Sequence, residues 1–182
     1  MTSRRAAWSD FHRDLSREYR AFDFRRSGGA YIYGTAEREA IGVASYQIDP
    51  RFGGDCIRFC VNLEVFVLAL VDEARRAMPA ATMIKWENSH WSERLTLEPG
   101  EGDHWWELDT ANPGSAQLVR AWHVASVAST VAPKILEMAD ERVMLEYWSA
   151  GGYGGLGRFE RDRNFEKLME FRQKRGDSSK EL

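Results

Sequence analysis

Four polar residues that lie close together in the sequence have the side chains with which this chain could do chemistry: His90, Arg94, Asp103 and His104. A histidine ionises near neutral pH and can act as a general base, and a guanidinium group can hold a carboxylate or a phosphate. If the stretch around His90 is helical, Glu87, His90 and Arg94 share one face of the helix. One hypothesis is therefore a small hydrolase-like enzyme or small-ligand-binding protein that uses these residues.

Tryptophans surround the same residues and support a different interpretation. They are Trp86, Trp91, Trp105 and Trp106. A buried indole N–H needs a hydrogen-bond partner, and nearby polar groups supply one. That need explains the co-occurrence without catalysis, so we favour structural hydrogen bonds at His90 and Arg94 and expect no catalytic residue. If a ligand binds, Asn62, Trp91 and Trp105 are the residues that we expect to contact it.

We expect neither a metal nor a cofactor. The histidines and cysteines lack the close spacing that is typical of zinc sites. Cys56 and Cys60 lie roughly 13 Å apart if they share one strand, which is too far for a disulfide, so both are expected to be reduced. Residues 152–157 match the dinucleotide pattern GxGxxG. The pattern needs a preceding strand within a βαβ unit, and here a helix is predicted before it, so a flexible loop is the preferred interpretation.

The element that must position these residues is a long strand predicted over 56–67, with the sequence CIRFCVNLEVFV. Its alternate residues from Ile57 to Val67 are all apolar, which sends them to one face of a sheet. Arg58, Asn62 and Glu64 fall on the other face. A strand with one apolar and one mostly polar face is typical of an antiparallel sheet that helices cover on one side.

The order of the other elements predicts an α+β fold. We expect a helix over 9–20, a hairpin with a turn at Gly28 and Gly29, and a second strand over 40–48. Asn112 and Pro113 predict a helix start, and a stripe of apolar residues should face its neighbours. The stripe consists of Leu118, Ala121, Trp122, Ala125, Ala128 and Ala132.

Pro133 should end or kink that helix, and Asp140 is a candidate cap for the next one. We expect one α+β domain over residues 1–150. Residues 151–182 add a Gly-rich loop and a charged helix, as part of that domain or as a short appendage.

Composition argues against several classes of function. The chain has 182 residues and a formal net charge of −3, which gives no broad field for a polyanion, so nucleic acid is not expected as a partner. The N-terminus has no apolar run of a signal peptide, and no stretch approaches the roughly 20 apolar residues of a membrane helix. We therefore expect a cytoplasmic protein that does not bind membranes.

Three segments together resemble a known family: Phe59-Cys60-Val61-Asn62-Leu63, His90-Trp91-Ser92-Glu93-Arg94 and Asp103-His104-Trp105-Trp106. Their order and spacing are similar to those of the bacterial domain of unknown function 4304, over about residues 8–148. Two positions depart from its pattern, since Asp23 precedes Phe24 at the hairpin entry and Glu64 follows Asn-Leu, where the family often has Gly. The resemblance implies an α+β domain and no assigned reaction.

Two functions remain open from the sequence. The first is a non-catalytic binding or regulatory protein, of the immunity or antitoxin type, with a possible protein partner. It rests on the small size, the acidic balance and the lack of a catalytic constellation. The second is the enzyme or ligand-binding protein described above. Convergence of His90, Arg94, Asp103 and His104 in an open pocket would favour the second.

Overall fold

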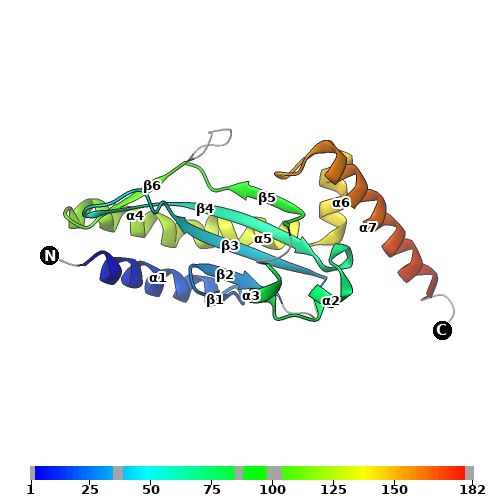
Figure 1. The fold of residues 1–182 in the computed structure, drawn as a ribbon, viewed down its shortest axis with the longest axis horizontal. Coiled ribbons are helices and arrows are strands. Elements are labelled where there is room, and N and C mark those ends of the chain that lie inside the picture. Colours follow the sequence, from blue (N-terminus) through cyan, green and yellow to red (C-terminus); the bar gives the residue numbers. More distant parts are fainter. Residues whose placement is uncertain (1–2, 35–38, 85–87, 98–103, 179–182) are drawn as a thin grey trace. The chain divides into compact units, whose positions relative to one another are not determined.

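The predicted α+β class is confirmed by a computed structural model, which describes residues 3–34, 39–84, 88–97 and 104–178 (Figure 1). Six strands form one antiparallel sheet. The strands are β1 (Arg25–Ser27), β2 (Ala30–Tyr33), β3 (Ala40–Ile48), β4 (Cys56–Val67), β5 (Trp91–Arg94) and β6 (Trp106–Asp109). The helices are α1 (Arg4–Arg20), α2 (Glu73–Arg76), α3 (Ala80–Met83), α4 (Pro113–Ser126), α5 (Ala132–Met138), α6 (Glu141–Ser149) and α7 (Arg158–Ser178), with a 3₁₀ turn η1 (Leu68–Leu70) and a π-helical turn η2 (Val127–Val131).

The chain packs as two compact units, each assembled from separate stretches. Unit 1 consists of Met1–Tyr33, Val43–Leu63 and Arg94–Ile135, and unit 2 consists of Gly34–Gly42, Glu64–Glu93 and Leu136–Leu182. β3 and β4 each contribute residues to both units. Compactness alone does not establish that a unit folds by itself, so one domain over residues 1–150 stays a prediction.

Sheet order follows the chain from β1 to β4. β4 then pairs with two later strands, β5 and β6. β1 and β2 form the predicted hairpin, in which Arg26 lies opposite Tyr31. In the β4–β6 pair, Arg58 lies opposite Glu107 and Phe59 lies opposite Trp106. The stretch 80–111, which has no clear periodicity, supplies α3 and these last two short strands.

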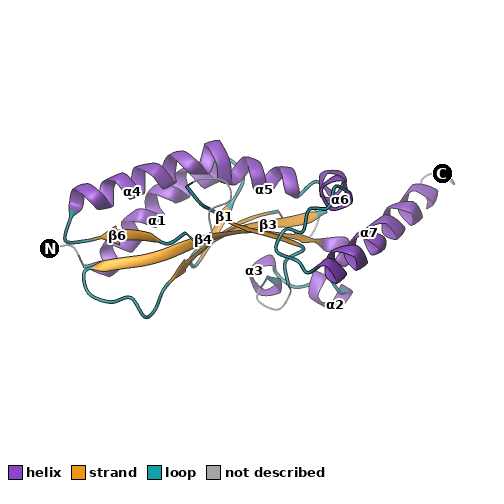
Figure 2. Ribbon diagram, turned by 90° about the horizontal axis from the view of Figure 1, so that it is seen from above, coloured by secondary structure: helices purple, strands orange, loops and turns teal. Residues whose placement is uncertain are grey.

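β4 alternates as predicted over most of its length, although Cys60 and Phe66, on the side of Arg58 and Asn62, are also buried. Phe59, Val61, Leu63 and Val65 are all buried, whereas Arg58, Asn62 and Glu64 are half-buried. In unit 1, α1 and α4 cover the face that carries Phe59 (Figure 2). Phe11 of α1 and His123 of α4 each have a ring centre 5.2–5.5 Å from the Phe59 ring or from each other. This aromatic layer is the core of unit 1. The alternate residues of β4, which include Arg58 and Asn62, lie on the opposite face of the sheet.

The predicted apolar stripe of α4 is wrong for most of its members, although Ala132 is buried. Leu118 is 74% exposed and Ala121 and Ala125 are also exposed, while His123 and Val127 are buried. The helix start is as predicted, because the Asn112 side chain accepts a hydrogen bond from the Ser115 N–H. Alanines fit either side of a helix, so their spacing does not decide which face is buried. His123, one position after Trp122, faces the sheet instead, with its ring centre 5.2 Å from that of Phe59.

Pro133 does not end its helix, which continues to Met138. The distortion lies just before it, in η2, where the Ala132 N–H donates to the carbonyl of Val127. A proline in a regular helix clashes with the carbonyl four residues earlier. The wider π-turn displaces that carbonyl and so admits the ring.

In unit 2, α6 begins at the predicted cap: the Asp140 carboxylate accepts from the Arg142 and Val143 N–H groups. Before β5, the chain forms η1 and the one-turn α2. α7 is tied to α6 by Arg175, whose guanidinium donates to Glu141 at 3.4 Å. Glu141 is buried, and this burial raises the pKa of its carboxyl.

Candidate functional site

His90, the leading candidate for a general base, lies in unit 2 and is 6% exposed. The Val67 N–H donates to its Nδ1 at 2.9 Å, and its own backbone N–H donates to the carbonyl of Val65. In a neutral ring that accepts at Nδ1, the proton is on Nε2. Neither nitrogen then offers a lone pair to a substrate, so the geometry favours the structural role predicted for His90.

Trp91, a predicted ligand contact, is 1% exposed and packs beneath the Gly-rich loop of unit 2. The Ser92 N–H donates to the Gly154 carbonyl at 2.6 Å, and the Gly154 N–H donates to the Tyr147 hydroxyl at 3.1 Å. A Cβ added at Gly154 would lie 2.2 Å from Trp91, and one at Gly155 would lie 2.0 Å from the Ser92 side chain. The GxGxxG pattern here therefore reflects close packing of a loop on β5, and α6 rather than a strand precedes it.

Three other candidates come together in unit 1. Arg94 Nε donates to Asn62 Oδ1 at 3.2 Å, and the Arg94 guanidinium carbon lies 5.7 Å from the centre of the Trp105 ring. Arg58, which was not among the predicted site residues, lies over the same ring at 5.3 Å. We call these four residues, Arg58, Asn62, Arg94 and Trp105, the arginine face.

The arginine face lies on the side of the sheet opposite the aromatic core of unit 1. Arg58 and Asn62 have the parity opposite to Phe59, and α1 and α4 pack on the Phe59 side (Figure 2). Gln47 of β3 extends the same surface, because the Asn62 amide donates to Gln47 Oε1 at 3.4 Å. All four residues of the arginine face are half-buried and Gln47 is exposed. An extended polar and aromatic surface thus remains open to solvent.

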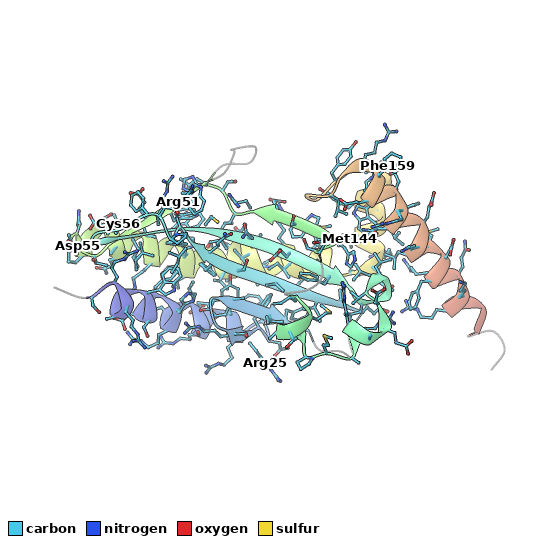
Figure 3. The ribbon with its side chains drawn as sticks, viewed as in Figure 1. Arg25, Arg51, Asp55, Cys56, Met144 and Phe159 are labelled. Atoms are coloured by element: carbon cyan, nitrogen blue, oxygen red, sulfur yellow. The ribbon has the colours of Figure 1, made fainter. Side chains whose placement is uncertain are left out.

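Two guanidinium groups lie at the centre of this surface. Among the described residues, Arg58 Nε is buried without a hydrogen-bond partner. Glu107 is exposed and lies opposite Arg58 in the β4–β6 register. Toward the start of β4, Arg51 pairs with Asp49 at 3.1 Å, and Figure 3 shows Arg51 and Cys56 at that end of the strand.

The remaining candidates do not complete a catalytic arrangement in the part of the chain that the structure describes. His104 belongs to unit 1 and packs edge-on against Trp106, with ring centres 4.4 Å apart. Asp103 lies outside the described residues, as do Trp86 and Glu87. His104 and Trp106 contribute to the aromatic core, whereas Arg94 lies on the arginine face.

Two buried histidines of unit 1 were missed by the sequence analysis. His12 and His123 are both fully buried. His12 Nδ1 lies 2.9 Å from the Tyr31 hydroxyl, and burial, helped by Arg26, lowers the pKa of His12 to about 4. Burial, helped by His104, lowers the pKa of His123 to about 3. For His12 the signal was available, because it lies on the same helical stripe as Phe11 and Leu15.

A groove of about 580 Å³ lies between α1 and α4 in unit 1. Its walls carry Asp10, Asp14 and Arg120. The Arg120 guanidinium donates to Asp14, and Arg13 pairs with Asp10 at 2.8 Å. These ion pairs neutralise much of the charge that a ligand would use, so the arginine face is the stronger candidate.

Both cysteines are free thiols, with Cys60 buried and Cys56 half-buried. Burial, followed by the nearby Glu107 carboxylate, raises the pKa of the Cys56 thiol. Within the described residues, no group of three or more histidine, cysteine, aspartate or glutamate side chains is placed to hold a metal ion. None of the helices in that part of the chain is long and apolar enough to cross a membrane.

Comparison with known proteins gives no match to a family model, to a curated protein or to a solved structure. The resemblance to the domain of unknown function 4304 therefore stays a prediction.

Proposed function

We propose that this is a non-catalytic binding or regulatory protein, and that the arginine face of unit 1 is the surface that holds its protein partner. The observation that carries the proposal is the pair of guanidinium groups at one indole ring, at 5.3 and 5.7 Å, on a sheet face that α1 and α4 leave open. Arginine and tryptophan are the residues that most often dominate binding energy at protein interfaces.

The surroundings of His90 weigh against the enzyme alternative. A catalytic histidine must present a nitrogen to the substrate, whereas Nδ1 of His90 is occupied by the backbone of β4. An immunity or antitoxin role is consistent with the small size and acidic charge of the chain. We propose this role together with a cytoplasmic location.

Site-specific photo-crosslinking tests this proposal in the cells that encode the protein. A benzophenone amino acid replaces Gln47, which borders the arginine face, and in a matched control it replaces Leu118, which is 74% exposed on α4. We expect ultraviolet-dependent adducts of defined mass at Gln47 and none of that mass at Leu118. The adducts should disappear in the double variant Arg58→Gln, Arg94→Gln.

Circular dichroism and thermal melting of the double variant serve as the folding control. Adducts of the same mass at both positions, or adducts that persist in a folded double variant, would contradict the proposal. Failure to form any adduct at Gln47 would also count against it.

A further inference from the structure

We infer that the arginine face recognises a carboxylate-bearing, extended segment of an acidic partner protein, an inference that rests on the proposed function and names the class of partner. Its centre is Trp105, which has one guanidinium from β4 and one from β5 beside its ring. These contacts hold two planar cations in place before any partner arrives.

The donors of the surface match a carboxylate. A guanidinium presents its N–H groups in a fixed fork whose spacing fits the two oxygens of a carboxylate, and such charge-assisted pairs are among the strongest hydrogen bonds in proteins. Arg58 Nε is a buried donor without a partner among the described residues. A buried donor of this kind is costly to leave unpaired.

The dimensions of the surface favour an extended segment over a free small acid. Arg58 and Asn62 are four residues apart on β4, which is roughly 13 Å along a strand. An extended peptide places every second side chain on one side, roughly 7 Å apart, so two acidic residues of one segment can reach both ends of the arginine face. Phe52, whose ring lies 5.4 Å from the Arg58 guanidinium carbon, adds apolar area beside the first of them.

Charge argues for an acidic protein over nucleic acid. Binding to a phosphate backbone draws its affinity from many cations along the strand. Here Arg58 lies opposite the exposed Glu107, and the whole chain carries a net charge of −3. One or two carboxylates can pair with Arg58 and Arg94. A longer run of phosphates would also come close to the rest of the chain, whose net charge is negative, and would be repelled by it.

Fluorescence anisotropy with defined probes tests the inference. The first probe is a labelled peptide of about ten residues that alternates Glu with Gly, so that its carboxylates have the spacing of an extended chain. The second is the same peptide with Gln in place of Glu, and the third is single-stranded oligo-dT of similar length. At about 50 mM salt, we expect the Glu peptide to bind at least roughly tenfold more tightly than either other probe.

Variants of the full chain locate the binding. Arg58→Gln and Arg94→Gln should each lower the affinity for the Glu peptide roughly tenfold. Arg58→Lys keeps the charge but loses the forked pair of donors, so its affinity should lie between those of wild type and Arg58→Gln. The control is the double variant Arg5→Gln, Arg25→Gln, which removes two charges, one more than either single variant, from exposed positions of unit 1 and should still bind as wild type.

Three outcomes would overturn the inference. They are equal binding of the Glu and Gln peptides, equal loss in the control variant, and tighter binding of oligo-dT, which would assign the face to nucleic acid. If the acidic peptide fails while crosslinks at Gln47 still depend on Arg58 and Arg94, the proposed function stands and only the class of partner is wrong. If the peptide binds but those crosslinks do not form, the proposed function fails instead.

Discussion

His12 and His123 are two ionisable rings inside the aromatic core of unit 1, where each folded ring is neutral at physiological pH. His123 has Phe11, Tyr46, Phe59, Trp106 and Trp122 around it, with ring centres 4.5–5.9 Å away. Among the described residues neither of its nitrogens has a hydrogen-bond partner. An unpaired polar atom in such a place costs stability, and a charged one would cost far more.

These two rings make the protein sensitive to acid. Their folded pKa values of about 4 and about 3 lie below the value of about 6.5 in an unfolded chain. The unfolded state therefore binds more protons below pH 6.5. The folded state therefore has its full free energy of unfolding above pH 6.5. It loses stability as the pH falls toward the pKa values of the two histidines in the folded state. Below about pH 6, each ring should cost about 1.4 kcal/mol of unfolding free energy per pH unit.

Urea unfolding at several pH values between 7 and 5 measures this slope. The variant His123→Leu, which removes one of the two rings, should reduce the slope by about 1.4 kcal/mol per pH unit. It should also cost little stability at pH 7, since neither nitrogen of the ring that it removes has a hydrogen-bond partner among the described residues. A slope that is the same in the variant and in wild type would show that these histidines do not control acid sensitivity.

His90 differs from His123, because it is a buried histidine whose Nδ1 accepts a hydrogen bond from the Val67 N–H. Because its Nδ1 accepts from the Val67 amide, His90→Ala leaves a buried backbone donor without its acceptor and should lower the unfolding free energy by about 1–3 kcal/mol. Thermal melting of His90→Ala against wild type measures the effect. A variant that melts at or above wild type would reopen a functional role for this residue.

At the scale of elements, the Gly-rich loop after α6 shows how packing can produce a motif. Gly152, Gly154 and Gly155 each approach a different neighbour, namely the Tyr147 ring, Trp91 and the Ser92 side chain. Gly154 and Gly155 also have positive φ angles, which glycine adopts without a Cβ clash. The resulting sequence pattern resembles that of a phosphate-binding loop, but the glycines are needed here because the loop packs closely against its neighbours, including Trp91 and Ser92 of β5.

Gly154→Ala should therefore destabilise unit 2 strongly. The new methyl group would overlap the Trp91 ring and occupy an unfavourable φ, and we expect a loss of about 2 kcal/mol or more. The control is Gly176→Ala, in α7 of the same unit, where a Cβ meets no atom within 4 Å and alanine favours the helix. Chemical denaturation of both variants decides the matter, and equal midpoints would mean that the loop yields to the extra methyl group.

The sequence predicts strands better than helix faces here, for a physical reason. β4 begins and ends where its alternation places it, because a period of two is hard to mistake over twelve residues. β3 also has the predicted bounds. The buried side of α4 was misjudged, because alanine is compatible with either face. Of the two effects predicted for Pro133, an end or a kink, the helix end does not occur, because the π-turn before Pro133 leaves no trace in hydrophobic periodicity.

At the scale of the whole molecule, β4 connects most of the structure, since it pairs with β5 and β6 and supplies residues to both units. Val61 is fully buried in it. Val61→Asp would bury an unpaired carboxylate at a cost of several kcal/mol, comparable to the stability of a whole domain, and should unfold the protein. Loss of the cooperative transition in thermal circular dichroism checks this, with Arg58→Ala as a control at a half-buried position of the same strand. A cooperative melt near that of wild type would remove Val61 from the core.

The candidate site was predictable in part. Asn62, Arg94 and Trp105 were identified from the sequence, and the structure brings them together. Arg58 was assigned only to the polar face of β4, because nothing in the sequence says that it shares an indole ring with Arg94. Such a pairing depends on which strands lie side by side. Local sequence patterns do not show that β6 pairs with β4, or in which register.

The π-turn between α4 and α5 also has a consequence for how this chain can change in length. A π-turn contains one residue more than the α-helical turn it replaces, so Val127–Val131 amounts to a single-residue insertion held within a continuous helix. Deleting one residue there would restore regular winding but rotate the following segment by about 100°. Ile135 would leave its buried position, and the Pro133 ring would meet a carbonyl that the wider turn now displaces. Homologues that lack the extra residue should therefore also lack the proline, a paired loss that an alignment of natural sequences would reveal.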